Sequence, residues 1–296
     1  MSYHRVKRPC ADRSGSGRFA VAVFGKINMV NLIYWRFMVS FAETLLLGVL
    51  QGVTEWLPVS SSGHLALAKE FLDWQPPLVF YILLHLGTLI VTLAFFRRDV
   101  VMISKALLRG DFRSREGRVG IFILLGSIPT AIIGLFFREL FESFFDNTIV
   151  IGLALLITGV LLFVSKRIEG KRSLNVLDTA ILGAAQGFAI IPGISRSGVT
   201  ISAGLLRRLE RESVFKFSFL LSIPSILGAL VVESDDLGLL VTNGDLPSAA
   251  LGLLASVIVG YLSLKALRIV VLKRKFHLFA FYCWIAGTLT VAFSLS

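Results

Sequence analysis

Long apolar runs alternate with short charged segments along most of the chain. Six runs have about the 17 to 25 residues with which a helix crosses roughly 30 Å of hydrocarbon. Because backbone groups in lipid must be hydrogen-bonded within a helix or a closed barrel, this pattern predicts an all-α polytopic membrane protein. We expect full transmembrane helices at 78–96, 119–137, 149–164, 214–232, 249–264 and 276–295.

Composition supports this class. Of the 296 residues, 55% are hydrophobic and 17% are charged, and the mean hydropathy is +0.79, which is more apolar surface than a soluble domain could bury. We expect one membrane-embedded domain over 37–296. Residues 1–36 are predicted to be a basic, poorly ordered extension, unless the true start lies nearer Met29 or Met38.

The net charge of +11 is distributed in a way that argues against nucleic acid as a partner. Six of these charges belong to residues 1–36, and the others lie in short segments between helices, where Lys and Arg mark the cytoplasmic side. The acidic segments 138–146 and 233–245 are therefore expected outside. The segment 99–118 is expected to be a cytoplasmic loop, as are the basic segments 166–172, 207–211 and 265–275.

Residues 51–64 form a polar stretch inside an otherwise apolar region. The stretch Gln-Gly-Val-Thr-Glu-Trp-Leu-Pro-Val-Ser-Ser-Ser-Gly-His carries one carboxylate, three serine hydroxyls and an imidazole. Such groups are costly in hydrocarbon and normally pair or line a water-filled cavity, which indicates a functional site. Pro58 and Gly63 predict a broken helix, in which Ser60 and Ser62 would alternatively serve only as helix caps.

A second broken segment runs from Val176 to Leu206, with basic residues on both flanks. Since both ends carry the cytoplasmic signal, we expect a re-entrant helical hairpin that enters and leaves on the cytoplasmic side. Its turn is expected at Pro192 and Gly193.

An internal repeat relates the two broken segments. A shift of 135 residues superimposes 47–63 on 182–198, with identical residues at seven of the seventeen positions. Three expected crossings separate the copies, so they should have opposite orientations in the membrane, with both hairpin tips near the midplane. This inverted-topology repeat places the N-terminus outside, which conflicts with the basic tail under the positive-inside rule; we give the internal segments more weight.

The first stretch offers metal ligands and groups for phosphoryl transfer. Gln51 and Glu55 are four residues apart, on one helix face, and could supply oxygens to Mg²⁺ or Ca²⁺ if substrate phosphates complete the shell. His64 could accept a proton from Ser61 or attack phosphorus itself. A packing role for His64 is the alternative, and His85 and His277 are interpreted as structural or interfacial.

The second segment offers groups that suit a phosphate. Arg196 has a planar donor fork and is flanked by Ser195, Ser197 and Thr200. Gly193 allows a close backbone approach, and the helix that follows would present free N–H groups to an anion. An arginine in a loop is often only a topology marker, but this one is enclosed by serines in an apolar hairpin.

At these residues the chain resembles a known family. The two segments, Gln51-x-x-x-Glu55 with 57–64 and Pro192-Gly193-Ile-Ser-Arg-Ser-Gly-Val-Thr200, are similar to the signature motifs of the bacitracin-resistance type undecaprenyl-diphosphatases. The resemblance extends from about Leu46 to the C-terminus. It implies an integral plasma-membrane phosphatase that uses a divalent cation to convert a C55 polyprenyl diphosphate to the monophosphate and inorganic phosphate. Such an enzyme recycles the lipid carrier of cell-wall glycans.

The resemblance also assigns roles to individual residues. It implies metal binding by Gln51 and Glu55, although many members have Glu in place of Gln51, and catalysis by Ser61 and His64. We favour Ser61 as the nucleophile with His64 as its base, and a phosphohistidine at His64 stays open. The phosphate-contacting set is expected to be Ser60, Ser62, Gly193, Ser195, Arg196, Ser197 and Thr200.

Two other functions fit parts of the pattern. Inverted repeats with broken helices are typical of secondary transporters and lipid flippases, but a compact set of Ser, His, Arg and Glu favours hydrolysis. The type 2 phosphatidic acid phosphatases need a histidine soon after their Ser-Arg pair, and none follows Arg196 before His277. The expected partners are a polyprenyl diphosphate, membrane lipids and, as an open option, a second copy of the chain. An opening toward the extracytoplasmic side would suit this substrate.

Overall fold

The computed structural model describes residues 29–72, 78–168, 170–232 and 246–295. Two compact units divide the chain, Met1–Ala42 and Glu43–Ser296. Most of the predicted basic extension, residues 1–28, lies outside the described residues. The described chain is helical apart from its connections and one isolated bridge between Arg172 and Leu209, so the predicted all-α class is confirmed.

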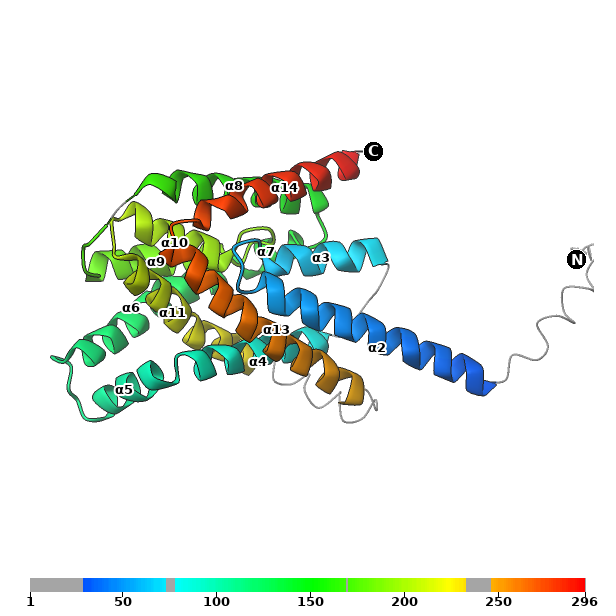
Figure 1. Ribbon diagram of the computed structural model, residues 1–296, viewed down its shortest axis with the longest axis horizontal. Coiled ribbons are helices and arrows are strands. Elements are labelled where there is room, and N and C mark those ends of the chain that lie inside the picture. Colours follow the sequence, from blue (N-terminus) through cyan, green and yellow to red (C-terminus); the bar gives the residue numbers. More distant parts are fainter. Residues whose placement is uncertain (1–28, 73–77, 169, 233–245, 296) are drawn as a thin grey trace, which may run out of the picture. The chain divides into compact units, whose positions relative to one another are not determined.

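Figure 1 shows the described helices in chain order, coloured from blue to red. Two short 3₁₀ helices, η1 and η3, interrupt the series at Ser165–Arg167 and Phe276–Leu278. The first half contains α2 (Met29–Thr54), α3 (Ser61–Leu72), α4 (Leu78–Phe95), α5 (Arg97–Leu108), α6 (Arg115–Phe136), α7 (Arg138–Ser143) and α8 (Thr148–Val164). The second half contains α9 (Val176–Phe188), α10 (Arg196–Leu206), α11 (Arg211–Val232), α13 (Leu246–Leu272) and α14 (Phe279–Leu295).

The described residues contain four helical segments that are long and apolar enough to cross a membrane: Arg115–Phe136, Arg211–Val231, Pro247–Leu272 and Phe276–Leu295. The chain is therefore a multi-pass membrane protein. The other two expected spans fall on shorter helices. Helix α8 has 17 residues. Helix α4 has 18 and is followed, after a bend of 82°, by α5.

Two expected boundaries differ from the structure. Residues 99–118 were expected to form a loop, but most of the segment is helical, because Val100, Ile103 and Leu107 lie on one helical face and pack on the core. The span expected to end at Leu264 continues to Leu272. Its buried side chains recur with helical spacing, while Lys265 and Arg268 lie on the exposed side.

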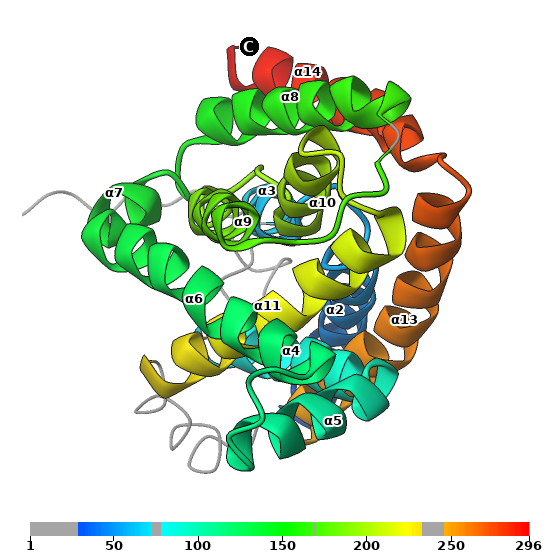
Figure 2. The ribbon, with the colours of Figure 1, turned by 90° about the vertical axis from the view of Figure 1, so that its left-hand side faces the viewer.

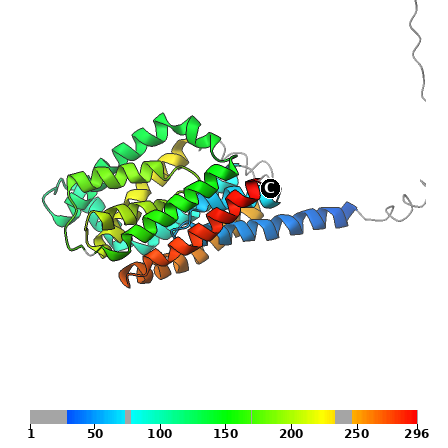
Figure 3. The same ribbon diagram turned by 90° about the horizontal axis from the view of Figure 1, so that it is seen from above.

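The 135-residue shift extends well beyond the polar segments. It superimposes the end of α2 on α9, and α3, α4 and α6 on α10, α11 and α13. The end of α2 packs on α13, where a side chain on Gly48 would collide with Gly252, and α9 packs on α6, where one on Gly183 would collide with Gly126. The last helices of the two halves, α8 and α14, lie side by side (Figures 2 and 3). Each half therefore covers the first helix of the other.

The main core cluster lies directly beside the polar stretch. Trp56 and Phe219 are fully buried, with ring centroids 5.4 Å apart. Phe96 and Phe215 extend this aromatic group. The residue after Glu55 is thus fixed in the core, which limits how far the carboxylate can move.

Candidate active site

The first broken segment turns between Thr54 and Ser61. Ser60 has a φ of 69°, a left-handed backbone conformation that is uncommon for a residue with a side chain. Its Oγ accepts a hydrogen bond from the backbone N–H of Gly63 at 3.2 Å. Ser60 therefore caps α3, as the alternative interpretation expected.

The second broken segment repeats this arrangement between Phe188 and Arg196. The turn contains Gly193, whose φ of 97° favours glycine. The hydroxyl of Ser195 accepts from the N–H of Gly198 at 3.1 Å, as Ser60 does in the first turn. In both copies the capping serine also contacts the serine two positions later, Ser62 at 3.2 Å and Ser197 at 3.3 Å. Equivalent residues of the sequence repeat thus make equivalent hydrogen bonds in the two turns.

The two turns contact each other directly. Gly193 N–H donates to the Oγ of Ser60 at 3.0 Å, and Ser197 Oγ donates to the carbonyl of Trp56 at 3.1 Å. The repeat position of Gly193 in the first turn is Pro58, which has no N–H to donate. The contact through Ser60 is therefore asymmetric.

Glu55 lies at the junction and binds groups from both turns. One carboxylate oxygen, Oε1, lies 2.6 Å from Nη2 of Arg196. The other, Oε2, accepts from Ser61 Oγ at 2.6 Å and from Gln51 Nε2 at 3.3 Å. The side chains of Glu55 and Arg196 are only 9% and 15% exposed, so this is a largely buried ion pair.

His64 binds elsewhere than expected. Its Nδ1 lies 2.8 Å from the carbonyl of Ser60, and its Nε2 lies 2.7 Å from the hydroxyl of Tyr282. Ser61 donates its hydrogen bond to Glu55 rather than to His64. The Glu55 carboxylate, which already accepts this hydrogen bond, is therefore the group placed to receive the serine proton.

Thr200 supports Arg196 rather than facing outward. Its hydroxyl donates to the carbonyl of Arg196 at 2.7 Å and also contacts the hydroxyl of Ser218, and its side chain is fully buried. Its expected contact with a phosphate stays a prediction. Thr200 instead fixes the first turn of α10, which carries the guanidinium.

Thr158 and Tyr282 were not predicted from the sequence. Thr158 on α8 donates to the carbonyl of Gly193 at 2.9 Å and accepts from the N–H of Ser195 at 3.2 Å, so it holds the second turn. Its polarity inside an apolar helix was the available signal. His85 was interpreted as structural or interfacial, and its Nδ1 lies 2.8 Å from the carbonyl of Tyr81 on its own helix. Nothing local in the sequence distinguishes Tyr282.

Asp178 fixes the base of the second hairpin. Its side chain is fully buried and accepts from Arg172 at 2.6 Å and from Arg207 at 2.9 Å. Burial alone would raise the pKa of Asp178, but the hydrogen bonds from both arginines outweigh it and hold the pKa below its usual value. The two ends of the α9–α10 hairpin are thereby joined.

The site presents one unused donor and one unused acceptor. Within the described residues, Nη1 of Arg196 and Oε1 of Gln51 are buried without a hydrogen-bond partner. Such groups are costly unless something else binds them. An anion suits the guanidinium, and a hard cation suits the amide oxygen. No group of three His, Cys, Asp or Glu side chains in the described part of the chain is arranged to hold a metal, so a cation would fit only with ligands from a bound phosphate.

Comparisons with known proteins agree with the motif resemblance. The profile of the family described as bacitracin resistance protein BacA matches residues 44–289. The undecaprenyl-diphosphatase of Korarchaeum cryptofilum is 40% identical over 257 residues, which cover 83% of this chain and 96% of that protein. The undecaprenyl-diphosphatase of Alkaliphilus metalliredigens is 42% identical over 271 residues, covering 86% and 98%. With most of its length matched in this way, the chain belongs to the bacitracin resistance protein BacA family.

Proposed function

We propose that the protein is an undecaprenyl-diphosphatase, which hydrolyses a membrane-bound polyprenyl diphosphate to the monophosphate and inorganic phosphate. The observation that carries this proposal is the hydrogen bond from Ser61 to Glu55, beside the unpartnered Nη1 of Arg196. The names of the related proteins support the same substrate. The enzyme would recycle the lipid carrier for cell-envelope glycans and so contribute to bacitracin resistance.

The geometry suggests how the first half of the reaction proceeds. Glu55 accepts the hydroxyl proton of Ser61 while Oγ of Ser61 forms a bond to the terminal phosphorus. The bond from that phosphorus to the bridging oxygen breaks, and the polyprenyl monophosphate leaves. Arg196 stabilises the charge on the transferred group through Nη1, while Nη2 keeps its bond to Glu55. Water then hydrolyses the phosphoserine. Direct attack by His64 is less favoured, since both its nitrogens are engaged.

We also propose a divalent cation, Mg²⁺ or Ca²⁺, that is shared with the substrate. Gln51 Oε1 and the Glu55 carboxylate would hold it together with diphosphate oxygens. The cation would neutralise part of the charge on the diphosphate. Two protein ligands are few, so binding should depend on the substrate.

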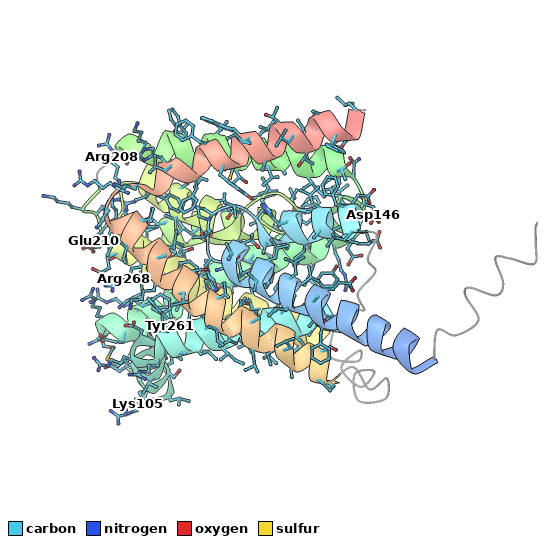
Figure 4. The ribbon with its side chains drawn as sticks, turned by 45° about the vertical axis from the view of Figure 1, so that its right-hand side comes forward. Lys105, Asp146, Arg208, Glu210, Tyr261 and Arg268 are labelled. Atoms are coloured by element: carbon cyan, nitrogen blue, oxygen red, sulfur yellow. The ribbon has the colours of Figure 1, made fainter. Side chains whose placement is uncertain are left out.

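In the membrane, we propose six spans and two re-entrant hairpins whose turns meet near the midplane. The charge distribution supports an orientation: Lys105, Arg208 and Arg268 lie at one end of the unit Glu43–Ser296, and Asp146 lies at the other (Figure 4). The basic end is assigned to the cytoplasm. Since Lys69 of α3 reaches Asp146 at 3.5 Å, α3 runs from the site toward the acidic end. This favours a site that opens to the extracytoplasmic side; a homodimer stays a prediction.

Phosphate release from a long-chain polyprenyl diphosphate by the detergent-solubilised protein tests this function. Wild type should release phosphate, and Arg196→Ala should lose at least about a hundredfold of that rate. Arg268→Ala is the matched control, because its guanidinium is half-exposed and binds Glu212 at the surface. Equal turnover by wild type and Arg196→Ala would exclude the site. Lipid movement across vesicles without phosphate release would instead indicate a flippase or transporter.

A further inference from the structure

Tyr282 brings a hydroxyl to the site from the C-terminal helix. Its Oη lies 2.7 Å from Nε2 of His64, and the two rings are nearly parallel, with an interplanar angle of 19°. The next residue, Cys283, binds the carbonyl of Pro58 at 3.4 Å. Helices α3 and α14 meet again where Phe71 contacts Phe293. These contacts along α14 therefore hold Tyr282 in place beside the turn between α2 and α3.

The partners of His64 determine which of its nitrogens carries hydrogen. A carbonyl oxygen can only accept, so Nδ1 donates to Ser60 and carries the proton. In the neutral ring Nε2 is then an acceptor, and the Tyr282 hydroxyl donates to it. After Nε2 gains a proton, the same hydroxyl can rotate and accept from it. The contact is thus maintained in both protonation states, which a phenylalanine could not achieve.

Hydrolysis through a phosphoserine transfers protons in both of its halves. Glu55 receives the proton of Ser61 in the first half and must return it when the serine leaves phosphorus. The attacking water also loses a proton, and while Glu55 still holds the serine proton a second base has to accept it. His64 is three residues beyond Ser61 on α3, on the same helix face, and its Nε2 can accept a proton.

We propose that Tyr282 positions His64 as the base for the second half of the reaction. The water oxygen forms a bond to phosphorus, and the bond from phosphorus to Ser61 Oγ breaks. Ser61 recovers the proton held by Glu55. One proton of the water passes to the Tyr282 hydroxyl as this hydroxyl gives its own proton to Nε2 of His64, and the water's second proton stays on the phosphate. His64 then releases its proton to solvent. This inference rests on the proposed function and adds to it a division of work between two bases.

Neighbouring groups leave one competitor for this role. Of the helices that contact α3, α8 has no titratable side chain, and α14 carries Tyr282 and the buried Cys283. On α3 itself, Lys69 binds Asp146 and Glu70 is exposed. His85 is the competitor, because its Nδ1 donates to the Tyr81 carbonyl and its Nε2 can accept a proton. The experiment must therefore separate the two histidines.

The test follows the phosphoserine with substrate labelled at the terminal phosphate. Tyr282→Phe should lower kcat roughly tenfold with little change in KM, and the acid-quenched protein should retain several-fold more label than wild type. Tyr261→Phe, which removes a hydroxyl on α13, should match wild type in both. In the His64→Gln background, Tyr282→Phe should have no further effect on kcat, whereas a purely structural role would lower it again.

Each outcome has a distinct meaning. Tyr282→Phe with wild-type turnover and no extra label overturns the inference, as does accumulation of label in His85→Gln but not in Tyr282→Phe. Absence of phosphate release by wild type would refute the proposed function instead. A readout independent of turnover is the ¹⁵N spectrum of histidine-labelled protein, in which Tyr282→Phe should move the Nε2 signal of His64 and leave Nδ1 nearly unchanged. A wild-type spectrum with the proton on Nε2 would contradict the assignment.

Discussion

Arg196 and Glu55 are 141 positions apart in the chain and form an ion pair of 2.6 Å in the interior of the protein. The pair joins the two halves of the repeat, since Glu55 belongs to the first turn and Arg196 begins the helix after the second. A shift of 135 residues places Ile190 at the position of Glu55 and Ser61 at that of Arg196. The internal symmetry therefore yields one charged site rather than two.

Removal of one partner should destabilise the protein as well as inactivate it. Arg196→Ala leaves the Glu55 carboxylate buried without its counter-charge, which typically costs about 3–5 kcal/mol. The double variant Glu55→Gln/Arg196→Ala should recover much of this stability without recovering phosphate release. Unfolding in detergent, measured beside activity, checks both points. A double variant no more stable than Arg196→Ala would show that the pair contributes little.

Ser60 combines a helix cap with a strained backbone. Ser60→Ala removes the contacts to Gly63 and Gly193 and keeps the left-handed conformation, whereas Ser60→Gly relieves it. We expect the Gly variant to be the more stable one. The matched position is Ser195, with a φ of −81°. The difference between Gly and Ala variants in the free energy of unfolding should be larger at Ser60 by about 1 kcal/mol. Equal differences at both positions would exclude strain at Ser60.

Thr158, on the last helix of the first half, holds the second turn. Thr158→Val keeps the shape of the side chain but leaves the carbonyl of Gly193 and the N–H of Ser195 without this partner. Without these bonds the start of α10, which carries Arg196, should shift. We expect this shift to lower the rate of phosphate release roughly tenfold. Thr290→Val is the control, because that hydroxyl bonds only its own helix, at the carbonyl of Ala286. Similar rates for both variants would mean that the turn is held without Thr158.

The metal concentration that phosphate release requires should depend on the residue at position 51. Gln51→Glu adds a second carboxylate and should lower the Mg²⁺ or Ca²⁺ concentration for half-maximal activity roughly tenfold. Gln51→Met, of similar length without an oxygen, should raise it. Titration of chelator-treated protein with each metal gives the comparison. If all three proteins show the same dependence, or none is affected by EDTA, the proposed cation is not held by this residue.

Asp178 should make stability depend on pH. Because its pKa is lowered in the folded protein, its contribution is fully present above the unfolded carboxyl value of about 3.9 and is lost as the pH falls through the lower folded value. Asp178→Asn should therefore unfold at a lower temperature than wild type near pH 7. Thermal unfolding in detergent should show the two proteins converging below about pH 4. A constant difference down to pH 3 would assign the effect to packing rather than charge.

Polarity inside apolar sequence was sufficient to find the centre of the site. Glu55, Ser61 and Arg196 lie in the two broken segments, and the repeat predicted that these segments correspond. What the sequence could not supply was the partner of each group. The preference of Ser61 for Glu55 over His64 depends on the exact start of α3 and on the carbonyl of Ser60.

Residues contributed by distant helices were beyond local inference. Tyr282 meets His64 across 218 positions, and a tyrosine in an apolar helix is ordinary by itself. Helix α5 was missed for a different reason: its basic residues resembled a loop, and only the helical spacing of Val100, Ile103 and Leu107 indicates a packed face.

The close approach of Gly48 to Gly252 and of Gly183 to Gly126 makes the halves dependent on each other. In each half, one helix packs on the first helix of the other half. Two identical subunits make the same kind of contact when they exchange an element. A chain cut near residue 170 would yield two fragments, one with the nucleophile and one with the arginine. Neither fragment would be expected to fold or act alone, and their joint expression should rebuild an enzyme from two separate polypeptides.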